Sequence, residues 1–117
     1  MRGDDLNNVE IKGQLVRDPE LKYTGNGTAV MTLSIAYKLI RREKEKVFYF
    51  DVVQFGPSAE DSAERLHKGM VVEIYGRLEQ DRWTDREGNS RSRVQIAAKD
   101  IEPVDSGRVA EYAEEEG

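Results

Sequence analysis

Apolar and polar residues alternate in several separate segments of this chain, and this period of two constrains the fold more than any other feature. In residues 9–15, Val9, Ile11 and Leu15 alternate with charged or amide side chains. Four further segments either alternate or are rich in β-branched and aromatic residues, and they span 29–38, 47–55, 70–78 and 91–101. Such segments are typical of half-buried β-strands. The sequence therefore predicts five strands, the fourth continuing through 82–84.

One helix is expected between the third and fourth strands. Pro57 and Ser58 open a segment in which Ala59, Ala63 and Leu66 recur at helical spacing. Ser58 is the expected N-cap, and residues 67–69 supply a cationic last turn with a glycine stop. Turns are expected at 24–28 and 85–89, where glycine and asparagine cluster between strands.

Three strands, one helix and two strands follow each other in the order of an OB-fold. The prediction is an all-β chain, a five-stranded Greek-key barrel with one short helix between strands 3 and 4. A chain of 117 residues has room for one such domain. We expect it to occupy residues 1–104 and to be followed by a disordered acidic tail at 105–117, where apolar periodicity ends.

The net charge of −5 has the wrong sign for a typical nucleic-acid binder. Residues 105–117 hold five acidic side chains and one arginine, a net −4, which leaves −1 for residues 1–104. A nearly neutral domain can still bind a polyanion if its cations share one face. The chain has no cysteine, no secretory-type leader and no apolar run near the roughly 20 residues of a membrane span. A cytoplasmic, nucleoid-associated location without membrane contact is expected.

Aromatic side chains interleaved with cations are the most informative candidate site. Tyr49 and Phe55 share one face of the third strand, and Trp83 stands among polar residues near the last hairpin. Aromatic rings beside cations can stack with the bases of a single strand without reading its sequence. Phe48 and Phe50, on the other face, are expected in the core. The candidate phosphate contacts are the cations near these rings: Lys38, Arg41, Arg42, Lys44, Arg77, Arg82 and Arg86.

Several short motifs together resemble the bacterial single-stranded DNA-binding protein family, over a stretch from about Asn8 to Ile101. They are Asp18-Pro19-Glu20-Leu21-Lys22-Tyr23, Asn26-Gly27-Thr28-Ala29-Val30, Val52-Val53-Gln54-Phe55-Gly56, Lys68-Gly69, Gly76-Arg77-Leu78 and Trp83-Thr84-Asp85-Arg86-Glu87-Gly88. The resemblance implies an OB domain, a homo-oligomer that is usually a tetramer, and binding of single-stranded DNA in replication, recombination and repair. It also implies that the family's stacking aromatics fall on Tyr49, Phe55 and Trp83.

The chain departs from this family at two places. A further stacking aromatic of many members falls near Ile40 or Arg41, so one stacking position is weakened or taken by a cation. The family's acidic tail typically ends in Ile-Pro-Phe, whereas this chain ends in Glu114-Glu115-Glu116-Gly117. The missing apolar tip argues against recruitment of replication or repair proteins by that route.

No enzyme, cofactor, metal or catalytic group is predicted. His67 is the only histidine, and a helix-end capping role suits it better than metal ligation. No glycine-rich phosphate loop ends in Lys-Ser/Thr. Two alternatives to single-stranded DNA binding remain: an OB module for primosome-type or RNA binding, and an OB module for protein assembly with weak nucleic-acid affinity.

Overall fold

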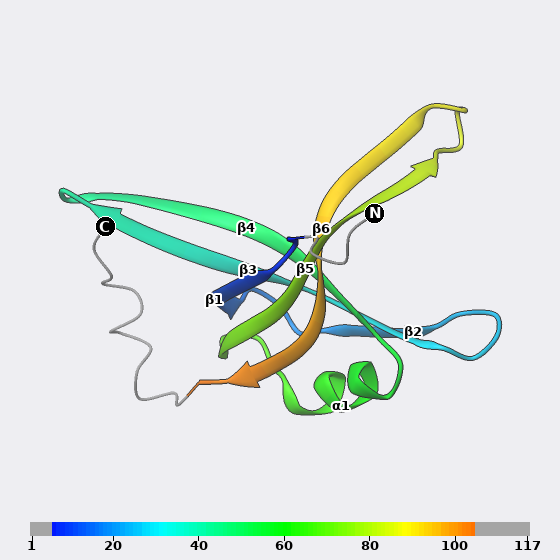
Figure 1. The fold of residues 1–117 in the computed structure, drawn as a ribbon, viewed down its shortest axis with the longest axis horizontal. Coiled ribbons are helices and arrows are strands. Elements are labelled where there is room, and N and C mark those ends of the chain that lie inside the picture. Colours follow the sequence, from blue (N-terminus) through cyan, green and yellow to red (C-terminus); the bar gives the residue numbers. More distant parts are fainter. Residues whose placement is uncertain (1–5, 105–117) are drawn as a thin grey trace.

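The structure, a computed structural model, describes residues 6–104 (Figure 1). Its elements in chain order are β1 (Val9–Leu15), β2 (Glu20–Tyr23), β3 (Ala29–Arg41), β4 (Lys44–Phe55), α1 (Pro57–Arg65), β5 (Val71–Thr84) and β6 (Ser90–Pro103). β2 was not predicted. All four of its residues are exposed, so it has no apolar alternation, and it forms because the turn at residues 24–28 folds it back onto β3.

Five of the strands close into a barrel. The sheet order is β1-β5-β6-β4-β3-β2, and β1 also pairs with β3 through Gln14↔Ala36 and Leu15↔Ile35. β4 and β6 run parallel where Val52 pairs with Ile96, and the other strand pairs are antiparallel. The arrangement confirms the predicted five-stranded barrel with a helix between its third and fourth strands, and β2 is an addition at the edge of β3.

Inward-facing aliphatic side chains fill the barrel, because every second residue of a strand points to the same side. The buried cluster consists of Leu15, Ala29, Met31, Leu33, Ile35, Val52, Ala59, Leu66, Val72, Ile74, Ile96 and Ile101. Ala59 comes from α1 and Leu66 from the residue after it, so the helix segment contributes to the same core. Within residues 6–104, every buried side-chain nitrogen or oxygen atom has a hydrogen-bond partner.

The boundaries of α1 differ from the prediction. Gly56, with φ +81°, is the N-cap residue, and no side chain caps the helix, so the assignment of Ser58 as cap was wrong. Pro57 takes the first helical position because its missing N–H needs no partner there. The helix ends at Arg65, which supplies the basic residue of the last turn. His67 lies beyond the helix end, and the Leu66 N–H donates to the carbonyl oxygen of Ser62.

Two hairpins extend from the barrel as arms (Figure 1). We define the first arm as residues 37–48 of β3 and β4, and the second arm as residues 77–95 of β5 and β6. The predicted strands stop at residue 38 and resume at residue 47, but only Arg42 and Glu43 form the turn, both with positive φ. A two-residue turn of this kind matches the twist of the strands, so pairing continues up to Arg41 and Lys44.

The second arm leaves the barrel at a backbone irregularity. The register of β5 and β6 shifts between Tyr75 and Gly76, which marks a β-bulge. A Cβ atom on Gly76 would lie 2.1 Å from the carbonyl oxygen of Ala97, so only glycine allows the two backbones to approach so closely. The bend directs residues 77–95 away from the core.

Phe48 and Phe50 do not share one environment, although both were predicted in the core. Phe50 is half-buried and packs against the core cluster. Phe48 is 40% exposed, so its assignment to the core was wrong. It lies in the first arm, beyond the closed barrel, where its ring stacks on Tyr37 with a centroid distance of 6.3 Å.

Candidate nucleic-acid interface

The two aromatic residues predicted on β4 point away from the core. Alternation along β4 buries Val52 inside the barrel and places Tyr49 and Phe55 outside, with exposed fractions of 69% and 53%. The two rings are separated by six residues of extended strand, about 20 Å. They are therefore spaced along the outer surface like two separate stacking positions.

Trp83 belongs to the same outer surface, because the strand register connects β4 to β5 through β6. Val53 of β4 pairs with Ala97 of β6, and Ala97 pairs with Arg77 of β5. Counting in steps of two from Arg77 along β5 leads to Trp83, which is 44% exposed. We call this outward surface of β4, β6 and β5 the aromatic face. All three predicted stacking residues lie on it.

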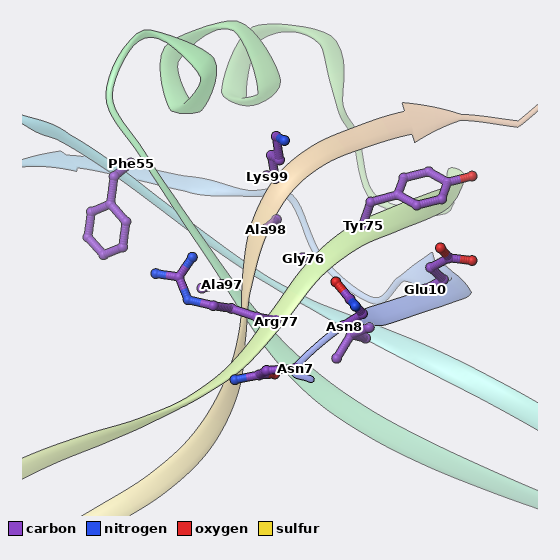
Figure 2. A pocket seen from close by; sticks show the side chains of 11 residues that line it. Asn7, Asn8, Glu10, Phe55, Tyr75, Gly76, Arg77, Ala97, Ala98 and Lys99 are labelled. Atoms are coloured by element: carbon purple, nitrogen blue, oxygen red, sulfur yellow. The ribbon is translucent and has the colours of Figure 1, made fainter. Parts of the chain in front are cut away.

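A groove crosses the aromatic face at the base of the second arm (Figure 2). Its volume is about 380 Å³, and Phe55, Arg77 and Lys99 contribute to its lining. In Figure 2 the Arg77 side chain extends toward the side on which Phe55 lies, while Glu10 lies at the opposite side. The groove thus combines an exposed ring with two cations, a combination that suits a base and its phosphates.

The predicted cations of the first arm are divided between its two faces. Lys38 lies on the same side as Tyr49, and its Nζ is 3.7 Å from a carboxylate oxygen of Glu45. Arg41 and Lys44 pair with each other on the reverse side, which continues the inward face of the barrel. There, with Arg42 at the turn, they line a hollow that also includes Phe48.

The predicted cations of the second arm are divided in the same way. Arg77 is on the aromatic face, where it forms an ion pair with Glu79 at 2.5 Å. Arg82 points to the reverse side and donates from Nε and from a terminal nitrogen to Oε1 of Gln80. Arg86 is exposed in the turn. The structure therefore brings Arg77 next to Phe55 but places Arg82 on the opposite side from Trp83.

Asp85 organises the turn that carries Arg86. Its Oδ1 accepts hydrogen bonds from the backbone N–H groups of Glu87 and Asn89, each at 2.9 Å, and its Oδ2 accepts one from Arg91. These bonds stabilise the carboxylate and lower the pKa of Asp85, the bond from the Asn89 backbone most. The turn therefore holds β5 and β6 in the register that places Trp83 opposite Arg91.

Two cations of the aromatic face, Arg93 and Lys99, were not among the predicted site residues. The guanidinium carbon of Arg93 lies 5.6 Å from the centroid of the Trp83 ring, within the range of a cation–π contact. The predicted turn at 85–89 could have placed Arg93 on the same side of the hairpin as Trp83. A hairpin around that turn pairs Trp83 with Arg91, and two residues further Arg93 lies on the same side.

Of the two residues near the missing stacking aromatic, only Ile40 lies on the same side as Tyr49. Ile40 pairs with Glu45 on the Tyr49 side of the first arm, whereas Arg41 points to the reverse side. A stacking role of Arg41 in place of the missing ring therefore has no support from the register. The Tyr49 side of the first arm has an aliphatic side chain at this point.

Residues 6–104 contain no group of three or more His, Cys, Asp or Glu side chains that could hold a metal ion. Across the same residues, no helix is long and apolar enough to cross a membrane.

Comparison with known proteins gives consistent matches along the described domain. A sequence profile described as the Single-strand binding protein family matches residues 6–104. A single-stranded DNA-binding protein of Treponema pallidum is 40% identical over 106 residues, covering 87% of this chain and 60% of that protein. One from Aquifex aeolicus is 38% identical over 118 residues, covering 95% and 78%. One from Deinococcus radiodurans is 38% identical over 107 residues, covering 87% and 35%. The chain thus spans from about a third to about three quarters of the length of these relatives.

Proposed function

This chain belongs to the Single-strand binding protein family, and we propose that it binds and protects single-stranded DNA without reading its base sequence. The observation that supports this most directly is the aromatic face. Tyr49, Phe55 and Trp83 are separate exposed rings on one continuous surface of β4, β6 and β5. Since every base has a π face, rings spaced along a surface bind unpaired bases of any sequence.

Stacking supplies the affinity in this proposal, and the cations direct the strand. In single-strand binding proteins of this kind a stacked base contributes about 1 to 3 kcal/mol, a range taken from those proteins. Arg77 lies on the aromatic face beside Phe55. The reverse-side residues can meet phosphates where a flexible strand passes round an arm. The proposed phosphate contacts are Lys38, Arg41, Arg42, Lys44, Arg77, Arg82 and Arg86.

A fluorescence titration tests this function, because Trp83 is the single tryptophan of the chain. Adding oligothymidine should change the fluorescence emission of Trp83. The affinity obtained from this change should fall as salt rises, because phosphate contacts release counterions. Oligouridine in parallel distinguishes DNA from RNA, because the 2′-hydroxyl is the group that differs. Tighter binding of oligouridine would favour the RNA-type module. No binding of either polymer at low salt would contradict the proposal and favour an assembly module.

We also propose that the chain forms a homo-oligomer, with a tetramer as the expected state. Two exposed apolar side chains on the reverse side of the second arm support this, Leu78 at 49% and Val94 at 61% exposure. Burying such residues against a second copy would be favourable. Sedimentation equilibrium should give a mass about four times that of one chain, and a monomer at micromolar concentration would contradict the proposal.

The cellular role proposed is protection of single strands in replication, recombination and repair, in the cytoplasm and at the nucleoid. The proposal is of a binding protein and not of an enzyme. The predicted acidic tail at 105–117 and its missing apolar tip lie outside the described residues. Co-purification with the whole 117-residue chain tests whether it recruits partner proteins.

A further inference from the structure

In the free protein, carboxylates already form ion pairs with several cations of the aromatic face and the second arm. On the aromatic face the ion pair of Arg77 with Glu79 measures 2.5 Å, and the exposed surface of the second arm adds the pair of Arg91 with Asp85 at 2.9 Å. Arg93 has two acidic neighbours: Asp81 at 3.7 Å and Asp51 at 4.0 Å. A face proposed to bind a polyanion is thus partly neutralised by its own acids.

Arg93 has the most elaborate of these arrangements. Its guanidinium lies over the Trp83 ring and between carboxylates from two different strands, β4 and β5. Asp51 is itself fixed, because its Oδ1 accepts a hydrogen bond from Oγ of Ser34 at 3.0 Å. The Arg93 side chain nevertheless stays 50% exposed, so it can reach solvent or a ligand without any change of the backbone.

We propose that Arg93 exchanges partners when DNA binds. In the free protein Asp51 and Asp81 hold it across the Trp83 ring, and in the complex its guanidinium pairs with a backbone phosphate. The inference rests on the proposed function and adds a regulatory property to it. Asp51 and Asp81 are positioning residues that compete with DNA for Arg93, and they set the affinity below the value that the cations alone would give.

The relative strength of the contacts supports this direction of exchange. Exposed ion pairs are weak, because water screens both partners and ordering two side chains costs entropy. An arginine can form two parallel hydrogen bonds to one phosphate, and such charge-assisted pairs are stronger. A base can use the ring surface beneath Arg93 only after the guanidinium has moved. Stacking of a base on Trp83 and transfer of Arg93 from the carboxylates to a phosphate therefore favour each other.

The exchange also affects the salt dependence of binding. A lysine or arginine that neutralises a phosphate of a single strand contributes about −0.7 to the slope of log affinity against log salt. When Arg93 leaves two carboxylates, these take up cations from solution and cancel part of that contribution. Removing both carboxylates should therefore make the slope steeper as well as the binding tighter.

The first test compares the double variant Asp51→Asn/Asp81→Asn with Asp61→Asn, by Trp83 fluorescence titration with oligothymidine. Asp61 lies on α1, where it pairs with Arg65, so this control removes one carboxylate away from the aromatic face. The double variant should bind about threefold to tenfold more tightly at low salt, with a slope steeper by at most about 0.7. The control should stay within about twofold of the original protein. Equal affinity and slope in the double variant and the control would overturn the proposal.

The second test observes Arg93 directly in the unaltered protein. NMR detects the Nε–H groups of the arginine side chains. The signal that disappears in Arg93→Gln is assigned to Arg93. Saturation with oligothymidine should shift this signal as the carboxylates are replaced by phosphate. An unchanged signal in a protein that binds the oligonucleotide would refute the exchange while leaving the proposed function intact. A protein that does not bind oligothymidine at all would refute both.

Discussion

The barrel and the two arms are built from the same strands but use their side chains in different ways. In the barrel portion of β3, Leu33 and Ile35 are at most 1% exposed. In the first arm Phe48 is 40% exposed, and Tyr49, the next residue of β4 at the base of this arm, is 69% exposed. A two-stranded hairpin is marginal by itself, so each arm depends on the barrel for its order. The comparison indicates that stability is concentrated in the barrel and proposed binding on the arms and the adjoining aromatic face.

The largest effect is expected at the junction of the two regions. Gly76→Ala places a methyl group against the carbonyl oxygen of Ala97, and a backbone atom cannot move aside easily. We expect a loss of about 3 kcal/mol or more in the free energy of unfolding, measured by urea denaturation. Gly25→Ala is the matched control, since nothing lies within 4 Å of its Cβ position. A loss no larger than that of the control would mean that the junction is adaptable.

Phe50 and Tyr49 are adjacent in the sequence, but Phe50 packs against the barrel core and Tyr49 is exposed on the aromatic face. Phe50→Ala should reduce the free energy of unfolding by about 2 to 3 kcal/mol, because the half-buried ring packs against the core. Tyr49→Ala should change it by less than about 0.5 kcal/mol and weaken DNA binding instead. Thermal unfolding and oligonucleotide anisotropy measure the two quantities. The opposite outcome would reverse the assignment of inner and outer faces.

Trp83→Ala should affect binding more than stability, since the ring lies on an arm. We expect a loss of about 1 to 3 kcal/mol in oligothymidine binding at every salt concentration, a range taken from proteins of this kind. Binding is measured by anisotropy of a labelled oligonucleotide, because the variant lacks tryptophan. Arg82→Ala is the contrasting variant, and it should flatten the salt slope by about 0.7. If Trp83→Ala unfolds the protein, the second arm is part of the folding core.

Deletion of residues 105–117 should leave the barrel unaffected and change only binding. The segment has a net charge of −4, so we expect it to compete with DNA for the cations of the arms. The shortened chain should bind a few-fold more tightly at low salt. The difference should fade as the screening length falls to about 10 Å at 0.1 M salt. Unfolding curves of the two chains should coincide, and equal affinity at low salt would show that the segment does not approach the arms.

The smallest expected effect is a local response of the second arm to acid. Hydrogen bonds hold the pKa of Asp85 below its ordinary value of 3.8, so the carboxylate stabilises the turn above that pH. As the pH falls through the lowered value, protonation removes this contribution. The amide signals of Glu87 and Asn89 should then shift in NMR spectra, while that of Ile74 in the barrel stays unchanged. Simultaneous shifts at all three would indicate that the arm and barrel titrate as one unit.

Prediction from sequence succeeded where one side of a strand is buried and failed where both sides are exposed. The five barrel strands were predicted because burial forces alternation, as in Val72 and Ile74. The length of the first arm was underestimated, because residues 41–46 are charged on both sides and show no period. β2 was missed for the same reason. Phe48 was misplaced because the alternation continues past the point where the barrel ends.

The sequence alone determined the number and order of the barrel strands, the position of the helix and the turn at Asp85. These depend on neighbouring residues and on a period of two, which a chain contains whatever it folds against. Only the tertiary structure decided that Tyr49 faces outward and Phe50 inward, since the two alternating sets are equivalent until β1 pairs with β3 and the barrel closes. The parallel pairing of β4 with β6 also brought Asp51 to Arg93 from a distant part of the sequence, whereas Asp81 faces Arg93 across the β5–β6 hairpin.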